Sequence, residues 1–182
     1  LSDRVRQELC PNKATASEWL EVQRTAHKMG IRSNASMLYG HIETLEERVD
    51  HLLSLRALQD ETGGFQTFIC FPFHPGNTEL EATHQRTSLW DELKTMAISR
   101  LMLDNFSNIK AYWVMLTLPI AQLALGFGAN DIDGTVSEEK IMHAAGAKSA
   151  TFLTQETIIE TIRQIGRVPV ERDSMYQIIR TL

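Results

Sequence analysis

The sequence predicts an α/β fold in which parallel strands alternate with helices, and three observations carry this prediction. Short apolar runs alternate with longer segments of helical periodicity. Glycine and polar residues gather just after the apolar runs, where the active face of a β/α barrel lies. Neither a dinucleotide-binding Gly-x-Gly-x-x-Gly nor a P-loop occurs. Four such units could form a small doubly wound sheet or half of an eight-unit barrel. The position of the polar residues favours half of a barrel, formed by residues 1–182.

The first part of the chain is expected to contain helical segments, one strand and a long helix. Helical patterns fill residues 3–29 with a break at a Pro-Asn pair and a stop at Gly30. The run "IRSNASMLY" (31–39) is the first strand candidate. A Thr-x-x-Glu capping box opens the helix expected at 45–61, whose leucines and valine recur at helical spacing opposite a face of charged residues.

The middle of the chain predicts two strongly apolar strands. "FQTFICFPF" (65–73) is too apolar to have a face in water, which is typical of a strand buried in a parallel sheet. A loop then leads to a helix expected at 88–106. "IKAYWVML" (109–116) is the third strand candidate, followed by a short helix at 119–127 that ends near a glycine.

The last part of the chain predicts one more short strand and two helices. "DIDGTV" (131–136) is the fourth strand candidate, before the helix expected at 137–147. A final helix is expected at 154–165. The arginines of the tail beyond it are expected to close the barrel rather than to bind a ligand.

Composition excludes several classes of function. The 182 residues suit one domain, and the net charge of −5 comes from interspersed acids and bases, which gives no basic face for nucleic acid. No apolar run approaches the length of a membrane span, and we find no signal peptide. The two cysteines, Cys10 and Cys70, match no disulfide framework or metal motif, which favours a reducing, cytoplasmic setting.

Two histidines and several acids between residues 36 and 53 raise the question of a metal site. A zincin helix needs two histidines four residues apart, whereas His41 and His51 are ten apart. We therefore predict no metal ligands here and expect His51 to lie on the surface of its helix. The stretch "SMLYGHIE" remains as a strand that ends in Gly-His-x-Glu.

Residues 34–78 resemble the radical S-adenosylmethionine enzymes of the futalosine route to menaquinone and of deazaflavin-cofactor synthesis. The motifs "FHPGNT", "GANDIDGTVSEEKIMHAAGA" and "GRVPVERDSMY" look most like the aminodeoxyfutalosine synthases. The sister cyclising enzymes would be expected to carry Gln in place of His74. The resemblance covers nearly the whole chain and corresponds to the carboxyl-terminal half of the family's radical S-adenosylmethionine barrel of the TIM type.

The resemblance implies a transferase in menaquinone biosynthesis. The full-length parent would use S-adenosylmethionine and a [4Fe-4S] cluster to add a 5′-deoxyadenosyl radical to 3-[(1-carboxyvinyl)oxy]benzoate. The family's Cys-x-x-x-Cys-x-x-Cys does not occur here, so the chain alone is expected to be inactive. Alternatives are a cyclic dehypoxanthine futalosine synthase, a subunit of the synthase of the deazaflavin precursor FO, or a non-catalytic β/α module that binds a ligand or partner.

The resemblance also implies site residues, although it identifies no catalytic residue. Family barrels carry Gly-x-Ile-x-Gly-x-x-Glu at the end of the fifth strand, against the adenine of S-adenosylmethionine. The matching positions are Ser36, Leu38, Gly40 and Glu43. Candidates for substrate binding are His41, His74, Asn77, Asp133 and Thr135. Each also has a purely structural interpretation as a turn, a loop or a helix cap.

A half-barrel has consequences for partners. Four β/α units would leave two strand edges unpaired and an apolar interior open. We therefore expect the chain to associate with itself or with its own amino-terminal half, and to take a small-molecule substrate.

Overall fold

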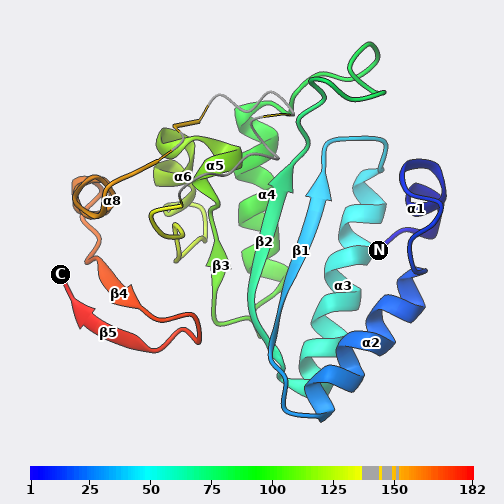
Figure 1. Ribbon diagram of the computed structural model, residues 1–182, viewed down its shortest axis with the longest axis horizontal. Coiled ribbons are helices and arrows are strands. Elements are labelled where there is room, and N and C mark those ends of the chain that lie inside the picture. Colours follow the sequence, from blue (N-terminus) through cyan, green and yellow to red (C-terminus); the bar gives the residue numbers. More distant parts are fainter. Residues whose placement is uncertain (137–143, 145–148, 151) are drawn as a thin grey trace.

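The computed structural model describes residues 1–136, 144, 149–150 and 152–182, and it is a mixed α/β structure built on a three-stranded parallel sheet. The sheet has the order β1-β2-β3, as Figure 1 shows. Its strands are β1 (Ser33–Tyr39), β2 (Phe65–Pro72) and β3 (Ile109–Lys110). The α/β class with parallel strands is therefore confirmed.

Four helices precede or connect the first strands. They are α1 (Asp3–Leu9), α2 (Ala16–Lys28), α3 (Leu45–Thr62) and α4 (Leu89–Met102). Capping boxes open α2 at Thr15 and α3 at Thr44, where the threonine side chain accepts from the third helical amide and a glutamate accepts from the threonine amide. Gly63 ends α3 at a φ of 60°, a left-handed conformation that glycine adopts without strain.

The two faces of the sheet differ. Ala35, Met37 and Tyr39 of β1 are buried in the hydrophobic core together with leucines of α3. The alternate residues Asn34, Ser36 and Leu38 are exposed on the opposite face. Successive side chains of a strand point to opposite faces, so one face packs on the helices while the other stays open in the described chain.

The third apolar run forms less strand than predicted. Only Ile109–Lys110 pairs with β2, and the following residues form the helices α5 (Trp113–Leu116) and α6 (Leu118–Ala124). The prediction of a strand over 109–116 was wrong beyond its first residues. All four residues of α5 are buried. A fully buried run shows no alternation of polar and apolar residues, so its sequence pattern cannot distinguish a helix from a strand.

The fourth predicted strand is reduced to one parallel bridge between Asp131 and Lys110. Asp133 has a φ of 70°, which turns the chain out of the extended conformation and explains why pairing does not continue to residue 136. The helix predicted at 137–147 lies almost entirely outside the described residues.

The carboxyl-terminal segment folds as α8 (Gln155–Gln164) followed by an antiparallel hairpin of β4 (Val170–Arg172) and β5 (Ile178–Thr181). The helix agrees with the prediction for 154–165, whereas the hairpin was not predicted. In Figure 1 the hairpin stands apart from the three-stranded sheet, at lower left.

The surface of α3 corrects two expectations. Leu45, Val49 and Leu53 belong to the predicted apolar stripe but are 67%, 38% and 48% exposed. His51, predicted at the surface, is buried, because the amino-terminal segment covers it and the Leu1 amino nitrogen lies 2.6 Å from its Nδ1. Among the described residues, no helix is both long and apolar enough to cross a membrane.

Candidate functional site

The predicted nucleoside-facing residues of β1 lie on the open face of the sheet. The register pairs Ser36 with Ile69 of β2, and Ile69 with Lys110 of β3. Because register partners in a parallel sheet point to the same face, these three side chains form one row across it. Leu38 pairs with Phe71 in the next row toward the carboxyl ends.

Glu43 fixes the loop that follows β1. Its Oε1 accepts a hydrogen bond from the Gly40 amide at 2.6 Å, and its Oε2 accepts one from the His41 amide at 2.9 Å. Burial opposes ionisation, but the hydrogen bonds from His41 and from the Gly40 amide outweigh it and hold the pKa of Glu43 at about 2. This geometry supports a role for Glu43 in fixing the loop.

Arg48 connects this loop to the helices. Its Nε donates to Glu43 Oε1 at 2.7 Å, and its Nη1 donates to Asp91 at the start of α4. The guanidinium also lies 4.9 Å from the ring centroid of Tyr39, the last residue of β1. One arginine thus joins the loop, two helices and the strand end.

Gly40 occupies a position that strongly favours glycine. Its φ is +86°, and the Thr87 methyl carbon occupies the place where a β-carbon would stand. The Thr87 hydroxyl donates to Glu92 Oε1 at 2.9 Å, which fixes the threonine. The requirement for glycine here therefore comes at least in part from the protein's own packing.

The two candidate histidines both bond to the backbone. The Nε2 of His41 lies 3.1 Å from the Leu38 carbonyl oxygen, and its Nδ1 lies 2.9 Å from Glu43 Oε2. The Nε2 of His74 lies 2.9 Å from the Met115 carbonyl oxygen, and burial lowers the pKa of His74. A neutral His74 donates its single N–H to that carbonyl, so it can offer a ligand only the acceptor Nδ1.

The remaining candidates are Asn77, Asp133 and Thr135. Asn77 adopts a φ of 57° in its turn, and its Nδ2 donates to the Ala144 carbonyl at 2.7 Å. Asp133 forms an ion pair with Lys110 at 2.9 Å. Thr135 is exposed on the segment that follows.

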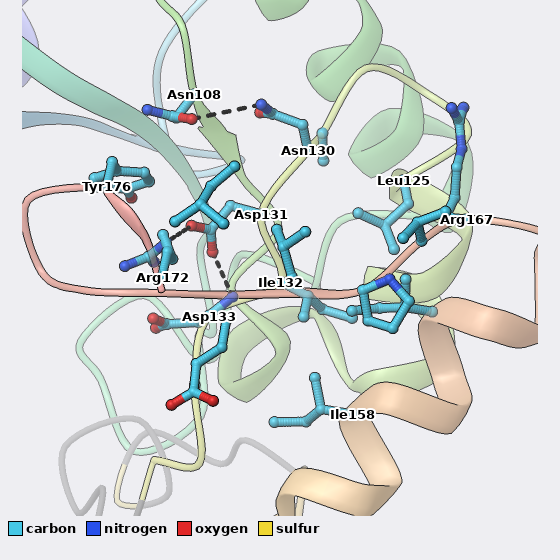
Figure 2. Close-up of a pocket in the computed structure, with 18 of the residues that line it drawn as sticks. Asn108, Leu125, Asn130, Asp131, Ile132, Asp133, Ile158, Arg167, Arg172 and Tyr176 are labelled. Carbon is cyan, nitrogen blue, oxygen red and sulfur yellow. Dashed lines mark hydrogen bonds and ion pairs between the residues drawn. The ribbon is translucent and has the colours of Figure 1, made fainter. Parts of the chain in front are cut away.

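A charged cluster surrounds Asp133, as Figure 2 shows. Asp131 accepts from the Asp133 amide through Oδ1 and from Arg172 Nε through Oδ2. The Arg172 guanidinium lies 3.9 Å from the ring centroid of Tyr176 within the same hairpin. The ion pair between Arg172 and Asp131 is the contact that holds the hairpin to the segment. The sequence analysis did not select Lys110 as a candidate. A lysine inside an otherwise apolar run was the signal that could have identified it.

An open cavity of about 1400 Å³ separates the 130–135 segment from α8 and the hairpin. Asp133 and Thr135 line it together with Ile158 of α8 and with Arg172. None of the candidates that follow β1 or β2 lines this cavity. The structure thus brings Asp133 and Thr135 together and leaves the Gly40 loop and the His74 turn as separate groups.

The described residues contain no group of three or more His, Cys, Asp or Glu side chains that could hold a metal ion. The whole sequence has two cysteines, and Cys70 is buried in β2, where burial raises its pKa to about 12. A thiol held in its protonated form is not poised to bind a metal.

Comparison with known proteins gives a consistent family. The model of the CofH/MqnC C-terminal region matches residues 62–182. The chain is 48% identical to an aminodeoxyfutalosine synthase of Thermus thermophilus over 98% of its own length and 49% of that protein. It is 43% and 45% identical to 5-amino-6-(D-ribitylamino)uracil–L-tyrosine 4-hydroxyphenyl transferases of Archaeoglobus fulgidus and Methanothermobacter thermautotrophicus, over 98% and 97% of the chain and 52% and 49% of the relatives. The chain therefore spans about half the length of these relatives.

Proposed function

The chain belongs to the CofH/MqnC family, and from that premise we propose that it forms half of the barrel of an aminodeoxyfutalosine synthase. One observation carries this proposal: the 48% identity to the Thermus thermophilus synthase extends over 98% of the chain and exceeds the identity to the two transferases named above. The whole protein would add the 5′-deoxyadenosyl group to 3-[(1-carboxyvinyl)oxy]benzoate.

The half-barrel is supported by the order and the edges of the strands. The strands β1, β2 and β3 and the bridge at Asp131 follow one another as parallel neighbours, which is the order of four consecutive β/α units. Within the described residues β1 pairs with β2 alone, so its second edge is available to another strand. We propose that the other half of the barrel pairs there.

The proposed reaction requires S-adenosylmethionine and a [4Fe-4S] cluster, which together would supply the deoxyadenosyl radical. This chain does not fit the cluster, because Cys10 and Cys70 fall short of three thiolate ligands. The proposal therefore assigns the cluster to protein outside these 182 residues. The open face of β1 fits the nucleoside better, since Ser36 and Leu38 expose a hydroxyl and an apolar surface on which a flat ring can lie.

The residues of this chain would then orient the reactants. Glu43 holds the backbone of Gly40 and His41 in one geometry, and His74 ties the turn after β2 to Met115. Fixed loops at the ends of parallel strands place reacting atoms and exclude water, which is how a barrel promotes radical addition without side reactions.

The test uses the full-length protein, reduced under anaerobic conditions with S-adenosylmethionine and 3-[(1-carboxyvinyl)oxy]benzoate. Mass spectrometry should detect aminodeoxyfutalosine. Formation of 5′-deoxyadenosine from S-adenosylmethionine as the only product, with this substrate present, would contradict the proposal.

The transferase relatives support a second candidate. Their names specify L-tyrosine and 5-amino-6-(D-ribitylamino)uracil, and their 43% and 45% identities are close to that of the synthase. The same anaerobic assay with these two compounds decides between the candidates. Formation of a hydroxyphenyl-transfer product, with no adduct from 3-[(1-carboxyvinyl)oxy]benzoate (the enol ether), would favour the transferase over the synthase.

A further inference from the structure

Lys110 places a buried positive charge on the open face of the sheet. Its register partner is Ile69, whose partner is Ser36, so the lysine stands in the same row as a predicted nucleoside-facing residue. Lys110 is 9% exposed. An ammonium group at such a position is only weakly stabilised by water, so its partners decide its role.

The described chain gives this ammonium group one hydrogen-bond partner, Asp133 Oδ1 at 2.9 Å. An ammonium group carries three donors, so two remain. The neighbouring cation, Arg172, has more partners, because its Nε donates to Asp131, its Nη1 donates to the Asp173 carbonyl and its guanidinium stacks on the Tyr176 ring. Of the two cations, Lys110 therefore has fewer partners among the described residues.

The aspartate partner is held in place by its own backbone. Asp133 adopts a φ of +70°, and its amide donates to Asp131 Oδ1 at 2.7 Å. A left-handed aspartate is strained, and the turn made by Asp131 stabilises it. Asp133 is thereby fixed beside Lys110 and orients the ammonium group.

We propose that Lys110 binds a carboxylate of the ligand, with Asp133 as the residue that positions the ammonium group. The inference rests on the proposed function, whose substrate carries two carboxylates. The row supports an aryl or enol carboxylate in particular, because Ile69 adds an apolar wall and Ser36 a hydroxyl beside the charge. A charge-assisted hydrogen bond to a group as buried as the Lys110 ammonium is strong, which suits a single lysine to this role.

A purely structural ion pair makes a different prediction. If Lys110 and Asp133 only stabilise the fold, removing either charge should weaken the protein and change the affinity for charged and uncharged ligands alike. If Lys110 binds the ligand, removing the lysine charge should weaken binding of a carboxylate ligand, and removing the Asp133 charge should strengthen it. The reason is that the Asp133 carboxylate competes with the ligand carboxylate for the ammonium group.

The experiment measures equilibrium binding of benzene-1,3-dicarboxylate and of the uncharged benzene-1,3-dicarboxamide to the full-length protein. Lys110→Met should weaken binding of the dicarboxylate at least tenfold and leave the diamide unchanged. Lys110→Arg should retain most of the affinity, and Asp133→Asn should tighten dicarboxylate binding about threefold. Lys94→Met, which removes an exposed lysine of α4, is the matched control and should leave the affinity for both ligands unchanged.

Equal effects of Lys110→Met on both ligands, weaker dicarboxylate binding in Asp133→Asn, or no dicarboxylate binding by the unmodified protein would each overturn the inference. Turnover separates this result from the proposed function. If the Lys110→Met variant makes aminodeoxyfutalosine with an unchanged KM, the proposed function stands and the role of Lys110 is contradicted. If the protein binds the dicarboxylate through Lys110 but makes no product, the carboxylate site stands and the proposed function is contradicted.

Discussion

The methyl group of Thr87 occupies the position in which a β-carbon on Gly40 would stand. The contact joins the loop after β1 to the segment that leads into α4. A close approach by the protein itself is thus one reason for the absence of a side chain at residue 40.

Gly40→Ala should lower the free energy of unfolding by about 2–3 kcal/mol, since it adds a clash and places alanine at a φ of +86°. Denaturant unfolding of the full-length protein measures the loss. The double variant Gly40→Ala with Thr87→Ser keeps the hydroxyl that bonds to Glu92 and should recover part of it. No recovery in the double variant would show that Thr87 is not the obstacle.

Glu43→Gln should destabilise the protein in a pH-dependent way. The folded state holds the pKa of Glu43 at about 2, below the value of 4.5 expected for a free glutamate, so the carboxylate stabilises the fold above pH about 4.5. That stabilisation is lost as the pH falls from about 4.5 through about 2. At pH 7 the difference should be about 3 kcal/mol, from about 1.4 kcal/mol for each pKa unit.

Urea unfolding of Glu43→Gln and of the unmodified protein at several pH values measures this difference. Glu160→Gln, an exposed glutamate of α8, is the control and should show little change. A difference between Glu43→Gln and the unmodified protein that stays constant down to pH 2 would contradict the assignment of the shift to Glu43.

His74→Gln should be tolerated, whereas His74→Ala should not. Glutamine can donate its amide N–H to the Met115 carbonyl as His74 does, while alanine leaves a buried acceptor unpaired at a cost of about 1–3 kcal/mol. Unfolding and turnover of the enol ether should both rank the variants in this order. A loss of turnover in a stable His74→Gln variant would instead show that the imidazole Nδ1 contacts the substrate.

The isolated 182-residue chain should not be a clean monomer. Leu38 is 45% exposed on the open face of the sheet, and within the described residues β1 has a strand neighbour on one side only. Such edges and faces favour association with another chain. Light scattering on the purified chain should show a dimer or larger species, and a monodisperse, stably folded monomer would be incompatible with the half-barrel.

The sequence by itself determined the features that depend on near neighbours in the chain. The Thr15 and Thr44 capping boxes, the left-handed end of α3 at Gly63 and the strands β1 and β2 follow from patterns of a few residues. The motifs that follow these strands were also sufficient to identify the family, which the comparisons confirmed.

Only the tertiary structure decided which groups meet across long separations in the chain. The apolar run after Lys110 became helix although β2 continues to Pro72, and His51 was buried by an amino-terminal segment that no local pattern places there. Thr87 reached Gly40, and Asp133 reached Lys110, because packing and strand register bring distant backbones together. Local periodicity reports the environment of a segment, whereas contacts between segments depend on the free energy of the whole fold.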